Sequence, residues 1–510
     1  MPRSDDLFSQ LSLHWTDPDK VAIETGAGRL YRYRDILAAT SRFANALKAS
    51  GVKPGDRVAA RVEKSPEALF LFLACLRAGA AYLPLNTAYT EAELDYFLRD
   101  AEPSVFVCRP GMSEAASLCE RSGAPALFTL GTEEDGTLAA LAGGQPDVFE
   151  DVPRSASDLA AILYTSGTTG RSKGAMLSHG NLTSNAAALV EAWRFTSDDV
   201  LLHALPIFHA HGLFVATNVI LMTGASMIFI PKFDPNEVFR LLPRCTAMMG
   251  VPTFYVRLLD DARLTREAAA HMRLFISGSA PLLPETHRSF LERTGHSILE
   301  RYGMTETGMN TSNPYEGDRV PGTVGLPLPG VEVRIANPET GEILGREEIG
   351  VIELRGPNVF EGYWRMPEKT KAEFRNDGFF ITGDLGKIDA RGYVHIVGRG
   401  KDLIISGGFN VYPKEVECEF DALPGVAESA VIGVPHPDFG EGVMAVVVPA
   451  KNSDLQEKDV IETLKSRLAN YKLPKRVFFV DDLPRNAMGK VQKNLLRDAY
   501  CDLFGGKSKP

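Results

Sequence analysis

The residues from Tyr164 to Gly174 combine three glycines, several hydroxyl side chains and two cations within eleven positions. Glycine allows positive φ and a close backbone approach to a ligand, while hydroxyls and cations suit phosphate oxygens. This stretch therefore predicts a polyphosphate-binding loop. Its spacing, Gly167-x-x-Gly170-x-x-Lys173, differs from the Walker pattern, so a P-loop NTPase is not supported. Alone, such a stretch is more often a surface turn, so the interpretation depends on the rest of the chain.

The composition is that of a multidomain globular protein. A chain of 510 residues exceeds one compact core, which predicts two or more domains. The net charge of −10 disfavours nucleic acid or an anionic membrane as the main partner. The six cysteines are scattered without a C-x-x-C pair, which argues against a zinc site and a disulfide framework. With no apolar run of membrane-spanning length, we expect a cytoplasmic protein.

The elements that must position the loop alternate along the first 330 residues. Short apolar runs separated by amphipathic segments are typical of parallel α/β sheets. We expect strands at 57–62, 104–108, 159–163, 199–205, 226–230, 247–250 and 273–277. Helices are expected at 66–78, 91–100, 181–192, 236–242 and 284–294, with Asn181 as the N-cap of its helix.

The pattern changes after about residue 330. Alternating strands at 331–335, 350–354 and 392–397, between Gly-rich turns, predict a small β-subdomain. The Gly-rich stretches 398–402 and 406–410 indicate a boundary with a hinge. Beyond it, helices at 413–422 and 457–470 and strands at 428–432, 443–448 and 477–480 predict a further domain of about 110 residues.

Five segments, in order over more than 300 residues, resemble the ATP-dependent adenylate-forming superfamily of acyl-CoA synthetases, adenylation domains and luciferases. They are 164–174, Glu300 to Thr307, Ile381 to Asp384, Gly398 to Asp402, and Pro484 to Lys490. The resemblance implies an α/β fold with an adenylation domain at 1–400, made of two α/β subdomains and a small β-subdomain. A smaller, mobile α+β lid domain would follow at 401–510, with its hinge near 400–402.

The resemblance also implies a reaction in two steps and a set of site residues. Because a carboxylate would have to expel oxide, it is first converted to acyl-AMP, and cations around the α-phosphate supply most of the catalysis. Lys490 would bridge the carboxylate and the α-phosphate, Thr305 would contact that phosphate, and Glu306 would hold Mg²⁺. The remaining ATP contacts are expected at Thr165, Ser166, Gly167, Thr168, Thr169, Lys173, Gly278, Ser279, Ala280, Pro281, Glu300, Arg301, Tyr302, Gly303, Met304, Asp384 and Arg399.

The second step implies a rotation of the lid about Lys401. In the family this motion withdraws Lys490 and brings another segment to the site, where the thiol of CoA attacks acyl-AMP. The CoA contacts would lie at Ser406, Gly407, Gly408 and Phe409. Nε-acetylation would remove the charge of Lys490, so an acetyltransferase and a deacetylase are expected as partners.

The acid is the least determined part of the reaction. Arg257 follows an expected strand end at Gly250, and its guanidinium could read a second carboxylate and reject monoacids. From spacing alone, a surface arginine on a helix is equally supported. Residues 84–89, 203–212 and 300–322 resemble malonyl-CoA synthetases, in which Arg257 would read the distal carboxylate. Ser279 and Met309 would lie near the acyl group and His209 would form a pocket wall.

The expected reaction converts malonate, ATP and CoA to malonyl-CoA, AMP and diphosphate, with methylmalonate as an alternative acid. A medium-chain or aryl acyl-CoA ligase would share the same machinery. A peptide-synthesis adenylation module is disfavoured, since about twenty residues after Lys490 leave no room for a carrier domain. A catalytically silent nucleotide-binding protein is disfavoured by Thr305, Glu306, Asp384 and Lys490.

Overall fold

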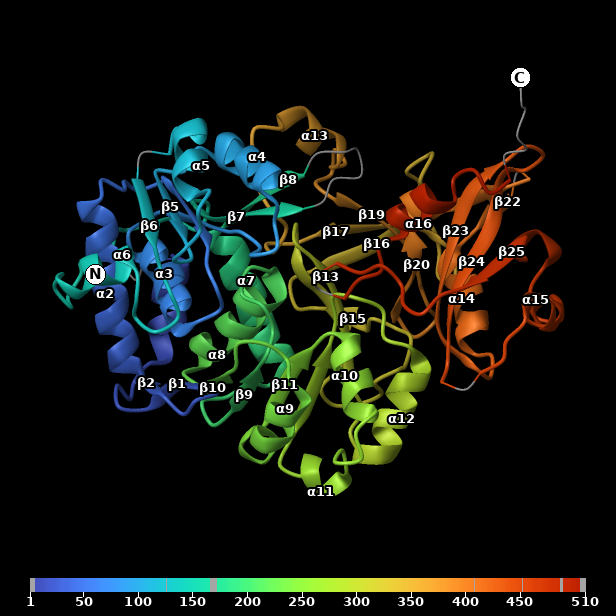
Figure 1. Ribbon diagram of the computed structural model, residues 1–510, viewed down its shortest axis with the longest axis horizontal. Helices are drawn as coiled ribbons and strands as arrows, with labels where there is room; N and C mark the ends of the chain where they lie inside the picture. Colours follow the sequence, from blue (N-terminus) through green and yellow to red (C-terminus); the bar gives the residue numbers. More distant parts are fainter. Residues whose placement is uncertain are drawn as a thin grey trace.

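The computed structural model describes residues 5–504, apart from 125, 166–171, 408, 452 and 487–488. Its strands form four sheets, and its helices cover them in a large N-terminal region and a smaller C-terminal domain (Figure 1). The expected fold class is therefore confirmed. No helix in the described part of the chain is long and apolar enough to cross a bilayer.

The largest sheet of the N-terminal region has nine strands in the order β15-β14-β13-β12-β11-β9-β10-β1-β2. The six strands from β13 to β1 run parallel, and β2, β14 and β15 add antiparallel edges. The strands are β1 (Val21–Thr25), β2 (Leu30–Arg32), β9 (Val200–His203), β10 (Ser226–Phe229), β11 (Ala247–Gly250), β12 (Leu274–Ser277), β13 (Leu299–Met304), β14 (Gly308–Ser312) and β15 (Leu326–Pro327).

A second sheet has seven strands in the order β18-β8-β7-β4-β3-β5-β6. Its members are β3 (Arg57–Arg61), β4 (Ala81–Pro84), β5 (Val105–Cys108), β6 (Ala126–Thr129), β7 (Leu159–Thr165), β8 (Lys173–Ser178) and β18 (Gly362–Tyr363). The antiparallel pair β7 and β8 flanks the phosphate loop that the sequence predicts. One hydrophobic core takes side chains from both sheets and from α3 (Pro66–Arg77), in which every residue is buried. A helix that is buried on all sides is typical of the interior between two packed sheets.

The other helices of the N-terminal region cover these sheets (Figure 1). They are α1 (Leu7–Leu11), α2 (Tyr33–Ala49), α4 (Glu91–Ala101), α5 (Ala115–Ser122), α6 (Thr137–Gly143), α7 (His179–Trp193), α8 (Asn218–Thr223), α9 (Pro235–Leu241), α10 (Pro252–Leu259), α11 (Arg266–Ala269), α12 (Pro284–Thr294) and α13 (Pro367–Ala372). A π-helical segment, His211–Thr217, precedes α8.

The small β-subdomain is an antiparallel sheet of β16 (Glu332–Ala336), β17 (Gly350–Arg355), β19 (Phe380–Ile388) and β20 (Val394–Arg399). A 3₁₀ turn at Gly400–Asp402 leads from β20 into the C-terminal domain. That domain contains β21 (Ile404–Ser406), β22 (Phe409–Val411), α14 (Pro413–Asp421), β23 (Val426–His436), β24 (Gly440–Pro449), α15 (Glu457–Lys465), β25 (Arg476–Phe479) and α16 (Lys493–Tyr500).

Two expected helix boundaries are wrong. The helix expected at 181–192 begins at His179, because Ser178 is its N-cap and Asn181 completes a capping box from the third helical position. The helix expected at 457–470 ends at Lys465. The chain turns there, which allows Leu468 and Leu473 to join Leu464 in the core of the domain.

Candidate active site

Asp384 lies at the centre of the expected ribose site. It pairs with Arg399 across β19 and β20, and its Oδ1 lies 2.7 Å from Nε of that arginine. Tyr302 reaches the other carboxylate oxygen from β13 and donates its hydroxyl proton. Burial and the Asp384 charge hold the pKa of Tyr302 well above its usual value. The fold thus assembles the three residues, and their contacts with ribose and adenine remain predictions.

The turn from Gly278 to Pro281 follows β12 and lies against Arg301 of the neighbouring strand. A Cβ atom at Gly278 would lie 2.3 Å from Cζ of Arg301, so only glycine leaves room for the guanidinium. Ser279 has φ of 71°, a left-handed conformation that costs an ordinary residue of order 1 kcal/mol or more. The conformation of the turn therefore makes room for Arg301. Its contact with adenine is the role that the sequence predicts.

Arg301 is buried, and its Nε and Nη2 atoms have no hydrogen-bond partner within the described residues. Burial lowers its pKa to about 9. Buried polar groups without partners are costly, which makes an unpaired guanidinium a marker of a ligand site. The sequence groups Arg301 with the ATP contacts, and that role remains a prediction.

Two histidines lie beside this arginine. His211 begins the π-helical segment, and its Nδ1 lies 3.1 Å from Oγ of Ser279. The backbone N–H of His211 donates to Nδ1 of His209 at 3.2 Å. Burial, Arg301 and Lys490 lower the pKa of His209 to about 4, so its imidazole is neutral near pH 7. A neutral ring is compatible with the expected wall role.

Met309 and Glu300 occupy nearby positions of the nine-stranded sheet. Met309 is buried on β14, and its methyl group would lie 2.4 Å from a Cβ at Gly303. This places the thioether over the β13 backbone, next to Met304. Glu300 is buried and accepts the N–H of Gly322 at 3.3 Å, so its carboxylate is engaged within the protein.

Arg257 lies in the last turn of α10 and is exposed. The buried side of that helix carries Tyr255, whose hydroxyl donates to the carbonyl of Ile276 at 2.6 Å on β12. Arg257 therefore points away from the sheet, and no ion pair joins it to any other described residue. Its contact with a substrate carboxylate remains a prediction.

Glu306 and the flanks of the phosphate loop form a second centre. Glu306 is buried, which raises its pKa, and Thr165 at the end of β7 donates to its Oε1 at 3.3 Å. Tyr363 of β18 also reaches Oε1, at 3.2 Å. Lys173 at the start of β8 lies 4.0 Å from the Tyr363 ring centroid. Ser166, Gly167, Thr168 and Thr169 lie outside the described residues, and the roles of all these groups remain predictions.

Sequence reasoning did not find Tyr363 and Glu373. The Tyr363 hydroxyl donates to Oε2 of Glu373 at 2.7 Å, and Nζ of Lys173 donates to Oε1 at 3.1 Å. Tyr363 follows Gly362, and Glu373 comes just after α13. Nothing in the local sequence predicts that they contact Lys173, nearly 200 positions earlier. The pairing of β18 with β8 brings Tyr363 to the site, and Glu373, just after α13, contacts it there.

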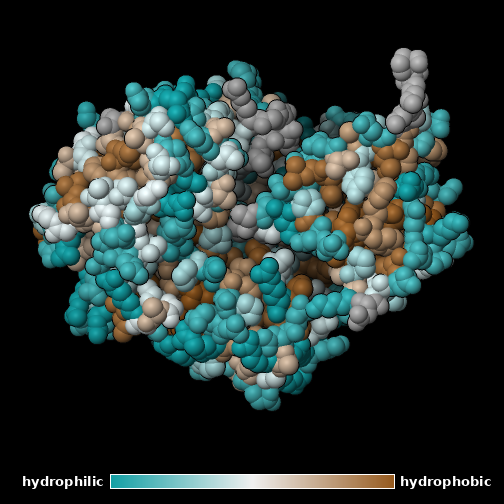
Figure 2. Space-filling view, in the orientation of Figure 1, coloured by the Kyte–Doolittle hydropathy of each residue, from teal (hydrophilic) through white to brown (hydrophobic). Residues whose placement is uncertain are grey.

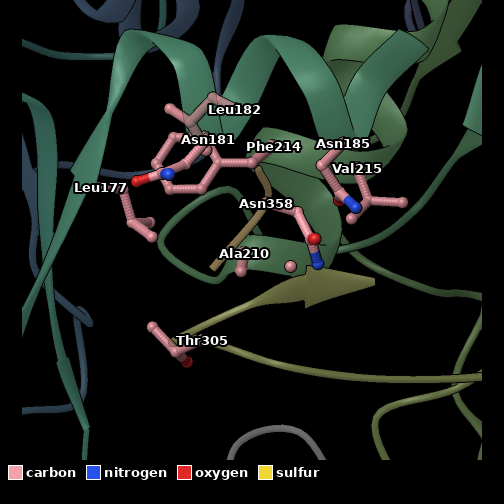
Figure 3. A pocket seen from close by; sticks show the side chains of 10 residues that line it. Leu177, Asn181, Leu182, Asn185, Ala210, Phe214, Val215, Thr305 and Asn358 are labelled. Carbon is pink, nitrogen blue, oxygen red and sulfur yellow. The ribbon is translucent and has the colours of Figure 1, made fainter. Parts of the chain in front are cut away.

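A small enclosed cavity lies beside Thr305 (Figure 3). Figure 3 shows Thr305 on one side and the side chains of Asn185, Phe214 and Asn358 on the other. Asn358 donates to the carbonyl of Thr307 at 2.7 Å, which ties the turn after Thr305 to the cavity wall. The turn that carries the expected phosphate ligand is thus held from behind by buried amides.

The C-terminal domain places Lys490 next to this site. Asn486 accepts the backbone N–H of Lys490 at 3.0 Å, and Gly489 lies against Thr253 of α10. The surrounding protein and the charges of Arg399 and Lys401 lower the pKa of Lys490 to about 8, while Asp384 and Asp402 oppose that shift. The Lys490 side chain is exposed. Its ammonium group is close enough to Asp384 for their charges to interact, and its role in catalysis remains a prediction.

The expected CoA segment lies elsewhere on the C-terminal domain. Ser406 ends β21, Gly407 follows it, and Phe409 begins β22, where its exposed ring stacks on Tyr471 at 4.7 Å. Gly408 lies outside the described residues. Figure 2 shows apolar residues gathered over β22 and β24 of this domain. Lys490 and the CoA segment are thus on separate parts of the domain, and Lys401 lies in the turn that joins it to β20.

Comparisons with known proteins agree with this architecture. The AMP-binding enzyme family matches residues 15–364, and the AMP-binding enzyme C-terminal domain matches 415–490. ATP-bound MatB from Rhodopseudomonas palustris is 62% identical, covers 98% of this chain and 100% of its own, and has a TM-score of 0.96. The apo form of that protein, with the same identity and coverage, has a TM-score of 0.85. This chain therefore has the arrangement of the ATP-bound form.

Two relatives differ in the acid that their names specify. A mitochondrial malonate–CoA ligase of Mus musculus is 36% identical over an alignment of 537 positions that covers 96% of this chain and 90% of that protein. A feruloyl-CoA synthase of an Amycolatopsis species is 38% identical over 492 residues, 95% of this chain and 96% of that protein. The two family models together match most of the chain, and both relatives align with more than nine tenths of it. The chain therefore belongs to the AMP-binding enzyme family.

Proposed function

We propose that this chain is a malonyl-CoA synthetase that converts malonate, ATP and CoA to malonyl-CoA, AMP and diphosphate through malonyl-AMP. The general activity, that of an AMP-forming acid–thiol ligase, follows from the family. Relatives named as malonate–CoA ligases support malonate as the acid, and a feruloyl-CoA synthase is about equally similar.

The observation that favours malonate over a monoacid is the unpaired guanidinium of Arg301. An aryl or fatty acid would leave this buried cation without a partner, whereas a second carboxylate would accept from its free Nε and Nη2 atoms. Ser279 and His211 border the same space and limit its size. Arg257, exposed on α10, would approach the distal carboxylate from the side of the lid.

In the adenylation step, we assign the bridge between the malonate carboxylate and the α-phosphate to Lys490. Its ammonium group would offset the repulsion between two anions. Thr305 would bind the α-phosphate, and Asp384 with Arg399 would fix the ribose. Glu306 offers a buried carboxylate of the hard-oxygen type that Mg²⁺ prefers, and the ion, bound with ATP, would neutralise phosphate charge.

In the thioester step, we propose that residues 401–510 rotate as a unit about Lys401. The rotation would withdraw Lys490 and present the segment from Ser406 to Phe409 to CoA. The 3₁₀ turn at 400–402 is short and glycine-containing, which suits a hinge. Methylmalonate is the proposed second acid, because one methyl group changes binding only modestly.

We propose that Lys490 is reversibly acetylated and that the protein is cytoplasmic. Acetylation of Lys490 by an acetyltransferase, reversed by a deacetylase, would remove its charge, and its exposed side chain is accessible to such enzymes. The free thiols of Cys75, Cys108, Cys119 and Cys245 are buried, as suits the reducing cytoplasm.

The test is the acid dependence of AMP formation with CoA present. Malonate should give the highest kcat/KM, methylmalonate a lower one, and succinate, acetate, octanoate and ferulate little or none. A preference for any monoacid would overturn the assignment of malonate. Equal rates with and without CoA would overturn the thioester step.

A further inference from the structure

A carboxylate outside the sequence motifs joins two lysines near the phosphate loop. Oε1 of Glu373, just after α13, lies 3.1 Å from Nζ of Lys173 and 2.7 Å from Nζ of Lys369. Its Oε2 accepts from Tyr363 at 2.7 Å. The two ammonium groups share one oxygen and are therefore neighbours, although 196 positions separate Lys173 from Lys369 in the chain.

The charges of this cluster favour an anion. Although burial opposes it, contacts with Lys369, Tyr363 and Lys173 hold the pKa of Glu373 below its usual value, so it is ionised. With Mg²⁺ on the neighbouring Glu306, as proposed above, Lys173 and Lys369 against the single charge of Glu373 would leave a net positive charge beside Thr165, which flanks the phosphate loop. Polyphosphates bind at such paired cations through charge-assisted hydrogen bonds.

The two lysines differ in how far their side chains are exposed to solvent. The side chain of Lys173 is only 10% exposed and is fixed between Glu373 and the ring of Tyr363. The side chain of Lys369 is 37% exposed on α13, a helix that packs against β18. Without Glu373, like charges would repel and the flexible Lys369 would extend into solvent.

We propose that Glu373 is a positioning residue that holds Lys173 and Lys369 together as a two-lysine site for the leaving pyrophosphate. Lys369 is then a second pyrophosphate-binding side chain. This inference rests on the proposed adenylation step, which releases pyrophosphate, but not on the identity of the acid.

The first test replaces Lys369 by alanine and measures Mg²⁺-pyrophosphate binding by calorimetry without any acid. Lys371→Ala is the matched control, since that lysine is exposed two positions along the same helix. Lys369→Ala should weaken pyrophosphate binding about threefold to tenfold, as for a partly exposed charge contact, and Lys371→Ala should not. The KM for malonate should stay unchanged. Equal binding by the two variants would overturn the role of Lys369.

The second test separates positioning from simple charge. Glu373→Gln should also weaken pyrophosphate binding although it removes a negative charge, and Glu373→Asp should restore part of the loss. Because Glu373 acts through Lys369, the double variant Lys369→Ala/Glu373→Gln should bind about as weakly as Glu373→Gln alone. Tighter binding by Glu373→Gln, or fully additive losses, would overturn the positioning role. If Glu373→Gln does not fold, Glu373→Asp and Lys369→Ala still decide.

These measurements distinguish the two proposals. If malonate is not the acid, the acid panel fails while the acid-free pyrophosphate results stand. If the two-lysine site is wrong, the panel can still favour malonate while Lys369→Ala behaves like its control.

Discussion

At the scale of single residues, the site is built around buried charge. Arg301 keeps a guanidinium under protein with two nitrogens unpaired among the described residues, and Glu306 keeps a carboxylate with a raised pKa. Such groups lower the free energy of unfolding unless a ligand pairs them. In each residue, the charged group that lowers the stability of the free protein is therefore the group that would bind a ligand.

Replacing Arg301 by methionine should show this opposition. The apolar side chain removes a costly unpaired cation, so thermal stability should stay equal or rise, by up to about 2 kcal/mol. The kcat/KM for malonate should fall about a hundredfold or more, because the distal carboxylate loses a buried partner. Thermal denaturation and initial rates measure the two effects.

Arg257→Ala is the control for that experiment, because this arginine is exposed and its loss should not change stability. Equal losses of malonate use in both variants would give the two arginines equal shares in recognition. An Arg301→Met variant with unchanged malonate kinetics would remove Arg301 from the acid site.

The pH dependence of the first half-reaction should report on Lys490. Its pKa is lowered to about 8, and the ammonium form carries the proposed bridging charge. The kcat/KM of malonate-dependent ATP–pyrophosphate exchange should therefore be level below pH 8 and fall as the pH rises through it. A rate that stays level well above pH 8 would contradict this. Lys490→Arg, always charged, should be slow but lose that decline.

The sequence predicted some of these residues and not others, for a physical reason. Lys490, Asp384 and Arg399 lie in continuous motifs, so their types and order are visible along the chain. The proposed acid site depends on which side chains meet across strands, which local sequence does not show. The β18–β8 pairing brings Tyr363 to the site, and Glu373 reaches it after α13 through its contact with Tyr363; local spacing encodes neither.

At the scale of elements, α7 links the phosphate region to the β-subdomain through its first turn. Asn181 accepts the N–H of Ser178 at 2.9 Å and donates to the carbonyls of Pro357 and Val359, each at 2.9 Å. The strands and helices of this region were predictable because buried runs of four to seven residues show a clear pattern. The capping residue was misassigned by three positions, because Ser178 and Asn181 are both good N-caps.

Asn181→Ala should destabilise the protein more than the loss of a simple cap. It removes the partner of one buried and two partly buried backbone groups, which should cost about 2–3 kcal/mol. Urea unfolding measures the loss, and Ser184→Ala on the same helix should cost under about 0.5 kcal/mol. Similar costs for both variants would contradict the linking role of Asn181.

At the scale of the whole molecule, the C-terminal domain meets the N-terminal region at Gly489 and also through α14, which packs against β20. A Cβ at Gly489 would lie 3.3 Å from Oγ1 of Thr253, and Gly489 has φ of 73°. The similarity to the ATP-bound form of the Rhodopseudomonas palustris protein fits a lid placed for adenylation. The lid position itself could not be predicted from sequence, since both states share the same motifs.

Gly489→Ala should therefore affect the two half-reactions unequally. The strained φ and the contact with Thr253 should displace Lys490 and slow ATP–pyrophosphate exchange about tenfold, for a cost of about 1–2 kcal/mol. Transfer from supplied malonyl-AMP to CoA should change little, because the proposed rotation withdraws Lys490 before that step. Equal slowing of both half-reactions would contradict a state-specific contact.

The order of strands in the two large sheets has a consequence for biosynthesis. The nine-stranded sheet takes β1 and β2 from the start of the chain and its other strands from residue 200 onward, while the seven-stranded sheet receives β18 only at residue 362. Neither sheet can close while the ribosome is still making the middle of the chain, so open strand edges persist during translation. Nascent chains that stall before residue 362 should therefore depend on chaperones and be prone to aggregate.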